Sequence, residues 1–322
     1  MTSDPTIVTV LSAPDGKPPG LAPLHEIAQV RMATDVDSLR ATLPGTQVLM
    51  VTDFRSGALA DAWACADRLR WVHATSAGVD ALLFPELVAS DVAVTNARGI
   101  FNRAIAEYVL GVILDFAKDS AGNWRLQRER RWRHRDTERI LDRRVLVVGA
   151  GSIGRDIARL CTAAGMRVAG IARSAREDDA FAAVHGIADL HKQLGQADYV
   201  VVATPLTSQT RHLFGAEEFA AMPAHARLIN VGRGPVVDTD ALVDALQSGQ
   251  IAGAGLDVFE QEPLLPGHPL WAMDQVQLSA HMAGDFIGWR QALTEQFLEN
   301  LQRWRRGEPL ANVVDKQQGY GA

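Results

Sequence analysis

The sequence has few cysteines, no long apolar run and no large excess of charge of either sign. Cys65 and Cys161 are its only cysteines, too few for a disulfide framework or a multi-cysteine metal site, and they suit a reducing compartment. No stretch approaches the roughly 18 apolar residues that span a membrane. The N-terminus carries Asp4 and no basic region, so it does not read as a signal peptide. Together these absences favour a cytoplasmic protein without a metal site.

The charges of the chain are nearly balanced. Lys and Arg number 32, Asp and Glu number 38, and the formal net charge is −6. Such a chain has no overall attraction for nucleic acid or for an anionic membrane. The stretch 118–144 is rich in arginine, as a nucleic-acid-binding stripe would be. Its interleaved Glu129, Asp136 and Glu138 favour a solvated helix face or a subunit contact instead.

Both halves of the 322-residue chain alternate short apolar runs with helical stretches, and 47% of the residues are hydrophobic. A chain of this size can bury the cores of two domains. The alternation predicts parallel sheets with helices on both faces, so the fold class is α/β. Strands are predicted at residues 6–11, 29–32, 47–51, 71–74, 92–95, 144–148, 167–171, 199–203, 227–231, 255–258 and 276–279. The predicted helices include residues 38–43, 57–65, 105–116, 152–164 and 288–304.

A glycine-rich turn lies between an apolar run and an amphipathic stretch. Its GxGxxG pattern places Gly149 at the tight turn, Gly151 where backbone approaches a pyrophosphate, and Gly154 where the helix packs on the strand. N–H groups at the helix start, around Ser152 and Ile153, favour the negative charge of phosphates. The alternative is a glycine turn without a ligand. The strand before it and the helix after it favour a Rossmann-type, doubly wound dinucleotide-binding domain.

The residues after the second predicted strand of this domain bear on which dinucleotide binds. NAD sites usually carry an acidic residue about 20 positions after the glycines. This sequence has Arg173, Ser174 and Arg176 there instead. Guanidinium groups form forked, charge-assisted hydrogen bonds to phosphate, so these residues favour NADP with its 2′-phosphate. The alternative is NAD, held by backbone contacts beside solvent-facing arginines.

Three chemically useful side chains follow predicted strands in the second half of the chain. Glu262 follows Arg233 by 29 residues and precedes His281 by 19. The ends of parallel strands are where open α/β sheets bind ligands. Taken singly, each residue has a structural explanation, since surface arginines, loop carboxylates and lone histidines are common. Their order and spacing as a set are more informative.

In this order and spacing, the three residues resemble the catalytic set of the D-isomer-specific 2-hydroxyacid dehydrogenases, particularly those of the glyoxylate/hydroxypyruvate reductase type. The likeness extends over most of the chain, because other segments resemble that family's substrate loop, domain crossover, nicotinamide loop and signature segments. These segments are residues 76–80, 94–107, 203–210, 230–234, 256–259 and 262–264. The sequence departs from the family at Ala280, where many relatives have Pro, and at Arg98, where many have a small residue.

The resemblance implies hydride transfer between NAD(P)H and a small 2-keto acid such as glyoxylate or hydroxypyruvate. A forked guanidinium suits both the substrate carboxylate and the developing oxyanion, so Arg233 takes that role. His281 would give the keto oxygen its proton. Glu262 would hold the imidazole ring and favour its protonated form.

The resemblance also implies further binding residues. Asp257 would bind the nicotinamide carboxamide or tune the Arg–His pair, and a structural aspartate at a strand end is the alternative. The substrate carboxylate would be bound by Ser76, Ala77 and Gly78 together with Arg233. The cofactor would be contacted by Thr204, Pro205, Thr210, Val231, Gly232, Asp257 and Gly284, in addition to the glycine loop.

The family organisation implies a discontinuous substrate domain. Residues 1–98 and 285–322 would form a flavodoxin-like unit, and residues 99–284 the Rossmann domain. The active site would then lie in the cleft, and closure would expel water. The family is usually dimeric, so we expect a homodimer whose interface includes the helix at 105–116 and the arginine-rich stretch after it.

Two alternatives stay open at this point. A phosphoglycerate-type dehydrogenase would need extra cations near the cleft, for which Arg55 and Arg98 are the candidates. A non-enzymatic corepressor-type protein shares the fold and senses the dinucleotide without turning over a keto acid. Phe54, Arg55 and residues 285–289 are expected to line the pocket for the substrate side chain.

Overall fold

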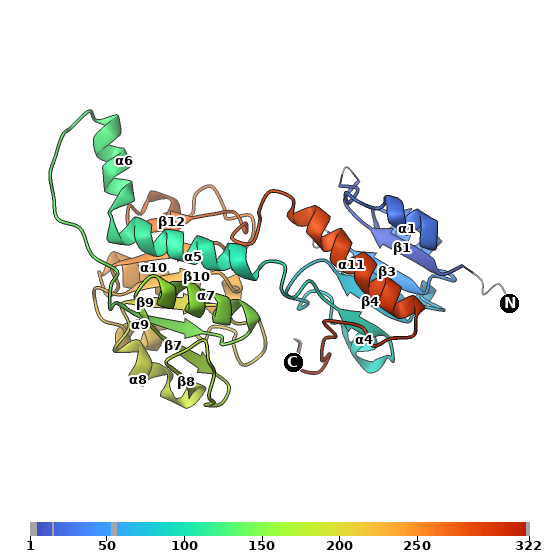
Figure 1. Cartoon of the computed structure of the whole chain (residues 1–322). Helices are drawn as coiled ribbons and strands as arrows, with labels where there is room; N and C mark the ends of the chain where they lie inside the picture. Colours follow the sequence, from blue (N-terminus) through green and yellow to red (C-terminus); the bar gives the residue numbers. More distant parts are fainter. Residues whose placement is uncertain (1–4, 15, 53–56, 320–322) are drawn as a thin grey trace. The chain divides into compact units, whose positions relative to one another are not determined.

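The computed structural model describes residues 5–14, 16–52 and 57–319. Its contacts divide the chain into two compact units (Figure 1). The first unit contains Met1–Phe101 and Phe286–Ala322, and the second unit contains Asn102–Asp285. Within the described ranges, no helix is long and apolar enough to cross a membrane.

The first unit contains a five-stranded parallel sheet of order β2-β1-β3-β4-β5, which is the flavodoxin-like order. Its strands are β1 (Ile7–Leu11), β2 (Gln29–Ala33), β3 (Val48–Val51), β4 (Trp71–Ala74) and β5 (Ala93–Thr95). Its α-helices are α1 (Ala22–Ile27), α2 (Val36–Thr42), α3 (Gly57–Ala62), α4 (Pro85–Ala89) and α11 (Trp289–Arg305), with a 3-10 turn, η1, at Trp63–Cys65.

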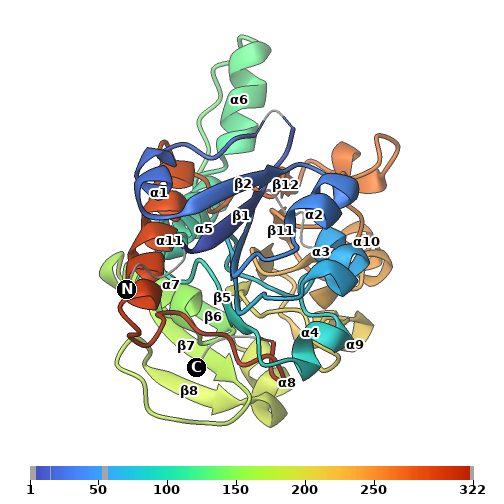
Figure 2. The same ribbon diagram turned by 90° about the vertical axis from the view of Figure 1, so that its right-hand side faces the viewer.

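Strand β3 shows why both faces of this sheet are covered. Successive side chains of a strand point to opposite faces, and all four residues of β3 are buried. Val48 and Met50 pack in the core with residues of α1 and α11, whereas Leu49 and Val51 pack with residues of α2, α3 and α4. Figure 2 shows these two groups of helices on opposite sides of the sheet. A continuous apolar strand is therefore the expected sequence here.

Helix α11 belongs to the first unit although it comes nearly 200 residues after β5, because it packs on the same sheet. Phe297 of α11 stacks on Trp71 of β4, with ring centroids 5.4 Å apart and an interplanar angle of 26°. The tail after α11 is tied to α4, since the Lys316 ammonium donates hydrogen bonds to backbone carbonyls of Leu87 and Val92 at 3.1 and 3.0 Å. The C-terminal segment thus completes the first unit.

The second unit contains a seven-stranded parallel sheet of order β12-β11-β10-β9-β6-β7-β8. Its strands are β6 (Arg144–Val148), β7 (Arg167–Ala172), β8 (Ala183–Gly186), β9 (Tyr199–Val202), β10 (Arg227–Asn230), β11 (Gly253–Leu256) and β12 (Val276–Leu278). The sheet order reverses direction between β6 and β9. In a Rossmann-type doubly wound sheet this switch point creates the crevice that binds ligands.

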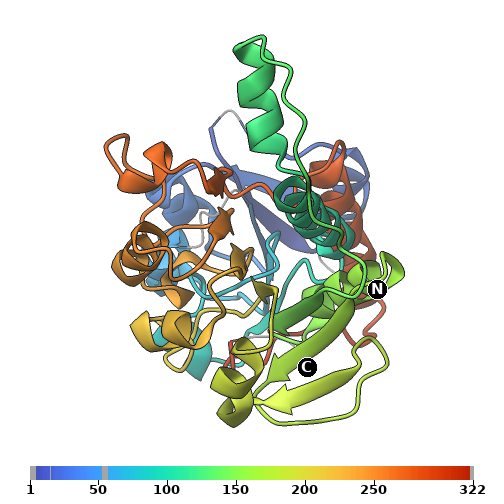
Figure 3. The same ribbon diagram turned by 90° about the vertical axis from the view of Figure 1, so that its left-hand side faces the viewer.

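Helices cover both faces of the second sheet (Figure 3). The helices of this unit are α5 (Asn102–Ala117), α6 (Ser120–Arg128), α7 (Ser152–Ala163), α8 (Leu190–Leu194), α9 (Ala216–Ala221) and α10 (Thr239–Gln247). Of these, α6 extends away from the sheet (Figure 1). Shorter 3-10 turns lie at Ile187–Asp189 (η2), Gly234–Val236 (η3) and Pro269–Ala272 (η4). Helices α5 and α7 pack on each other, while α8, α9 and α10 share a core with the other face of the sheet.

The predicted α/β fold is confirmed, and the predicted strands match to within about two residues. Strand β8 was not predicted, because Ala183–Gly186 is a short edge strand without a run of apolar residues. The predicted helix at 57–65 ends at Ala62 and continues as η1. The arginine-rich stretch is helical only in α6, and residues 129–143 have no regular helix or strand.

Candidate active site

The glycine loop after β6 requires glycine for two measurable reasons. Gly149 has φ of +112°, and a Cβ there would lie 2.6 Å from the carbonyl oxygen of Ala203. A Cβ on Gly154 would overlap the carbonyl oxygen of Gly149, so helix α7 could not pack this closely on the loop. At Gly151, among the described residues, no heavy atom lies within 4 Å of an added Cβ. The loop therefore leaves open space where a phosphate can approach the backbone.

The start of α7 adds donors to this loop. Gly151 is the N-cap residue of α7 and offers no side-chain cap, and Ser152 and Ile153 form the first turn. The first N–H groups of a helix lack partners inside the helix and carry a partial positive charge. An anion at this position would accept hydrogen bonds from these N–H groups and would balance their partial positive charge.

Arg173, Ser174 and Arg176 all follow β7 and are exposed. The guanidinium of Arg176 contacts the glycine loop. Its Nη2 donates to the carbonyl oxygen of Ala150 at 2.5 Å and lies 3.6 Å from a carboxylate oxygen of Asp178. The guanidinium of Arg176 is thus held beside the loop in which a dinucleotide phosphate would sit.

The loops after β9 and β10 approach each other closely. A Cβ on Gly232 would lie 2.7 Å from the carbonyl oxygen of Thr204. Thr210 fixes its own loop by donating to the carbonyl of Pro205 at 2.7 Å. The Oγ1 of Thr204 is buried and has no hydrogen-bond partner among the described residues. Buried polar atoms are nearly always paired, so this hydroxyl fits a ligand that supplies the missing partner.

Val231 and Gly284 are also placed by the structure. Val231 is buried, and its N–H donates to the carbonyl of Val202 at 3.0 Å, which continues the β9–β10 pairing. Gly284 lies three residues after His281 and is partly exposed.

Glu262 and His281 are paired in the structure. His281 Nδ1 lies 2.8 Å from Glu262 Oε2, and Glu262 Oε1 accepts a hydrogen bond from the Phe259 N–H at 2.9 Å. Burial by itself would raise the pKa of Glu262. The hydrogen bonds from His281 and Phe259, with the charges of His281 and Arg233, outweigh burial and lower that pKa from its usual value. Glu262 is therefore an ionised partner for the imidazole at neutral pH.

Arg233 is brought to this pair by the turn after β10. Asn230 holds the turn, because its Oδ1 accepts from the Gly232 N–H at 3.1 Å and its Nδ2 donates to the Arg233 carbonyl at 3.2 Å. A Cβ on Gly234 would overlap the backbone of Phe259, so glycine is needed where the turn meets the segment leading to Glu262. The three residues singled out in the sequence thus lie near one another in the second unit.

Asp257 is 2% exposed and acts as an acceptor for the segment that carries His281. Its Oδ1 accepts from the Ser279 hydroxyl at 2.5 Å and from the Met282 N–H at 2.8 Å, and its Oδ2 accepts from the Ala283 N–H at 2.9 Å. The His281 N–H donates to the Asp257 carbonyl at 2.8 Å. These contacts favour a structural role for Asp257, which the sequence left open as the alternative to a role in binding or catalysis.

Tyr108 and Ser279 were not singled out in the sequence. The Tyr108 hydroxyl lies 2.6 Å from Ser279 Oγ, which itself donates to Asp257. Burial raises the pKa of Tyr108, and the negative charge of Asp257 raises it further. Ser279 lies two residues before His281, and this nearness is a weak indication in the sequence that it belongs to the site. Tyr108 is 171 positions away from Ser279, and nothing in the sequence indicates that the two residues meet.

The loop after β4 in the first unit is fixed through its carbonyl groups. Ser76 Oγ donates to the Gly78 carbonyl at 2.6 Å, and Asn96 Nδ2 donates to the Ala77 carbonyl at 2.6 Å. The Ala97 N–H donates to the Ser76 carbonyl at 3.0 Å. In the sequence, Asn96 was only one residue of the segment 94–107. The structure shows that it anchors this loop. Phe54 and Arg55 lie outside the described residues.

Comparison with known proteins shows the family to which the chain belongs. Residues 110–283 match the D-isomer specific 2-hydroxyacid dehydrogenase, NAD binding domain. The chain is 34% identical over 266 residues to a glyoxylate reductase of Korarchaeum cryptofilum, covering 80% of each protein. It resembles the structure of a D-isomer specific 2-hydroxyacid dehydrogenase family protein from Aeromonas salmonicida, with a TM-score of 0.85, 31% identity and coverage of 97% of this chain and 100% of that chain.

Two similar structures contain a dinucleotide. A D-isomer specific 2-hydroxyacid dehydrogenase from Xanthobacter autotrophicus, in complex with NADPH and MES, has a TM-score of 0.81 and 35% identity, covering 97% of this chain and 99% of that chain. An NADPH-dependent glyoxylate/hydroxypyruvate reductase from Sinorhizobium meliloti, in complex with NADP and sulfate, has a TM-score of 0.84 and 28% identity, covering 98% and 100%.

A match of this extent to an NAD binding domain, on a Rossmann-type unit, makes the protein an oxidoreductase that binds a nicotinamide dinucleotide, NAD or NADP. Within that class, the chain belongs to the D-isomer specific 2-hydroxyacid dehydrogenase family. The family and the cofactor class predicted from the sequence are confirmed.

Proposed function

We propose that this enzyme reduces a small 2-keto acid to the D-2-hydroxy acid, with Arg233, Glu262 and His281 as its catalytic residues. The observation that carries the proposal is the 2.8 Å contact between His281 Nδ1 and Glu262, beside the charge of Arg233. A nicotinamide cofactor, when bound, would supply a hydride to C2 of the substrate. The electron pair of the carbonyl then moves to its oxygen, which must receive a proton.

In this proposal, His281 delivers that proton from its Nε2, because Glu262 holds Nδ1 and fixes the direction of the ring. The lowered pKa of Glu262 keeps the carboxylate charged, so it stabilises the imidazolium before proton transfer. Arg233 stabilises the negative charge that develops on the oxygen and binds the substrate carboxylate through its fork. The Ser76–Gly78 loop supplies backbone N–H groups to the same carboxylate.

The dinucleotide would occupy the glycine loop. Gly149, Gly151 and Gly154 shape the cradle, and the start of α7 offers its N–H groups to the phosphates. The partnerless hydroxyl of Thr204 fits a polar group of the cofactor. Asp257, by contrast, already accepts three hydrogen bonds from the protein. In this proposal it positions His281 and does not bind the cofactor.

We propose NADP as the preferred cofactor. Arg176 is already held at the carbonyl of Ala150 in the glycine loop, and Arg173 and Ser174 are exposed at the end of β7. Two similar structures contain NADPH or NADP, which supports the same preference. Replacing Arg173 by Asp should weaken NADPH binding more than NADH binding. An equal loss for both cofactors would remove Arg173 from recognition of the 2′-phosphate.

A homodimer is proposed as the working assembly. Trp124 of α6 is 57% exposed and Trp132, in the irregular segment after α6, is 102% exposed. Large exposed aromatic side chains are unusual on a surface that stays in water. Sedimentation analysis of the wild type and of Trp132→Ala would test this. A wild-type monomer at micromolar concentration would refute it.

The activity is tested by initial rates of absorbance change at 340 nm, with NADPH and NADH in parallel and a panel of 2-keto acids. Turnover of a keto acid supports the proposal, and the ratio of the two cofactors tests the preference for NADP. Dinucleotide binding without any turnover would overturn the reductase assignment and favour a dinucleotide-sensing binding protein.

A further inference from the structure

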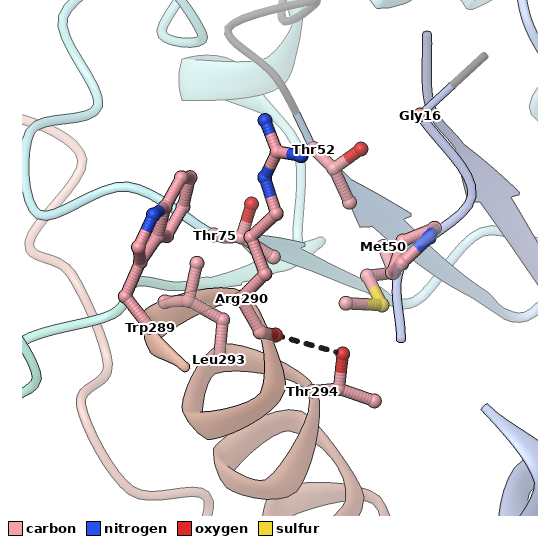
Figure 4. A pocket seen from close by; sticks show the side chains of 9 residues that line it. Gly16, Met50, Thr52, Thr75, Trp289, Arg290, Leu293 and Thr294 are labelled. Atoms are coloured by element: carbon pink, nitrogen blue, oxygen red, sulfur yellow. Dashed lines mark hydrogen bonds between the residues drawn. The ribbon is translucent and has the colours of Figure 1, made fainter. Parts of the chain in front are cut away.

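A pocket in the first unit lies next to the proposed carboxylate-binding loop. It opens at the carboxyl ends of β3 and β4, against the start of α11 (Figure 4). Its lining includes Met50, Thr52, Thr75, Trp289, Arg290 and Leu293. Thr75 immediately precedes Ser76, and its N–H donates to the Val51 carbonyl at 3.0 Å, so the pocket and the loop share one rigid strand end.

Arg290 is the one charged side chain among the described residues that line this pocket. Figure 4 shows its guanidinium extending from α11 toward the side of the pocket where Thr52 lies. The guanidinium carbon lies 5.1 Å from the ring centroid of Trp289, so the aromatic ring supports the cation. Within the part of the chain that the structure describes, no carboxylate forms an ion pair with it.

The other polar groups of the pocket are committed to the protein. Thr52 Oγ1 donates to the Leu11 carbonyl at 3.1 Å, and Thr75 Oγ1 donates to the Val51 carbonyl at 3.2 Å. Thr294 Oγ1 donates to the carbonyl of Arg290 itself at 3.2 Å. The guanidinium is therefore the strong donor that the pocket offers, and Met50, Leu293 and the Trp289 ring form apolar walls beside it.

We propose that this pocket receives the substrate side chain and that Arg290 binds a second acidic group there. The inference rests on the proposed function, in which the neighbouring Ser76–Gly78 loop holds the carboxylate next to the keto group. The apolar walls suit methylene groups, and the guanidinium beside them suits a carboxylate or phosphate. The substrate class is then a 2-keto acid with a second anionic group, and Arg290 is a specificity-determining residue.

The test compares substrates that differ at the far end of the side chain. 2-Oxoglutarate carries a terminal carboxylate, whereas 2-oxohexanoate has an uncharged chain of similar length. A second pair, phosphohydroxypyruvate and hydroxypyruvate, differs by a phosphate. The pair with the larger ratio of kcat/KM shows whether a carboxylate or a phosphate is the preferred group. We expect the better of the two substrates with a second anionic group to exceed its counterpart without that group in kcat/KM by about tenfold or more, since charge-assisted hydrogen bonds have effects of this size.

Arg290→Gln should reduce that ratio to near one, mainly through KM, and Arg290→Lys should restore part of it. Glyoxylate has no side chain to reach the pocket, so its kcat/KM should fall by a smaller factor. Arg305→Gln, which changes an exposed arginine at the other end of α11, is the matched control and should leave the ratio as in the wild type. A ratio near one in the wild type, or an unchanged ratio in Arg290→Gln, would overturn the inference.

A binding measurement separates this inference from the proposed function. Calorimetry with oxidised NADP present reports binding of 2-oxoglutarate, 2-oxohexanoate and phosphohydroxypyruvate without turnover. If no keto acid is reduced, the proposed function fails. Weaker binding of 2-oxoglutarate or phosphohydroxypyruvate to Arg290→Gln than to the wild type would still support the anion site, and equal binding of every ligand to both proteins would refute it.

Discussion

Replacing Asp257 by Asn tests whether this aspartate supports the segment of His281 or binds the cofactor. The carboxylate is 2% exposed and accepts one hydrogen bond from Ser279 and one each from the N–H groups of Met282 and Ala283. An amide of the same shape has a single acceptor oxygen. Whichever way it turns, its NH2 group faces at least one N–H donor, so a backbone group loses its partner.

The expected loss of stability in Asp257→Asn follows from these contacts. A buried donor left without a partner costs about 1–3 kcal/mol, and the remaining hydrogen bonds weaken because the acceptor is no longer ionised. For a domain of this size, a loss of 1 kcal/mol lowers Tm by about 2–4 °C. Displacement of His281 from its position should also lower kcat by about 10- to 100-fold.

The assay measures Tm by calorimetry, kcat with the best keto acid and the dissociation constant of NADPH by fluorescence. Asp274→Asn is the matched control, because its side chain is 85% exposed in the same unit and forms a surface ion pair. We expect Asp257→Asn to lose stability and kcat while its affinity for NADPH stays as in the wild type. An unchanged Tm with a weakened affinity for NADPH would refute the reasoning and return Asp257 to the cofactor site.

Three further changes are predicted. His281→Ala should lose about 10²- to 10⁴-fold in kcat while NADPH binding survives, as expected for loss of the proton donor, and unchanged turnover would remove His281 from the mechanism. The pKa of Glu262 is lowered in the folded protein, so its contribution to stability is present above its unfolded value of 4.5 and is lost as the pH falls through the lower folded value. Between pH 3 and 6, Glu262→Gln should therefore show a shallower fall of Tm on acidification than the wild type, and parallel curves would contradict this. Burial raises the pKa of Cys161 to about 12, so a thiol reagent at pH 8 should label the partly exposed Cys65 and leave Cys161 unmodified until the protein unfolds, as peptide mass spectrometry can check.

Local sequence patterns predicted much of the fold because strands and tight turns depend on neighbouring residues. The apolar runs of β3 and β6 are buried on both faces, so their composition alone marks them as central parallel strands. Gly149 and Gly154 are fixed by close backbone contacts within one turn, which the GxGxxG spacing reports directly. Strand β8 lacked such a pattern and was found only in the structure.

The candidate site likewise has a part that the sequence predicted and a part that only the structure shows. Arg233, Glu262 and His281 follow strands of one sheet in a recognisable order, so the sequence by itself predicted the family and singled out these three residues as candidates. It did not determine that Tyr108 supports Ser279 and Asp257, that Arg176 turns back to the glycine loop, or that Arg290 lines a pocket beside β3 and β4. Such contacts join residues far apart in the chain, and helix packing and sheet order decide which of them meet. Periodicity and spacing carry the local preferences of the backbone, whereas only the tertiary structure brings these side chains together.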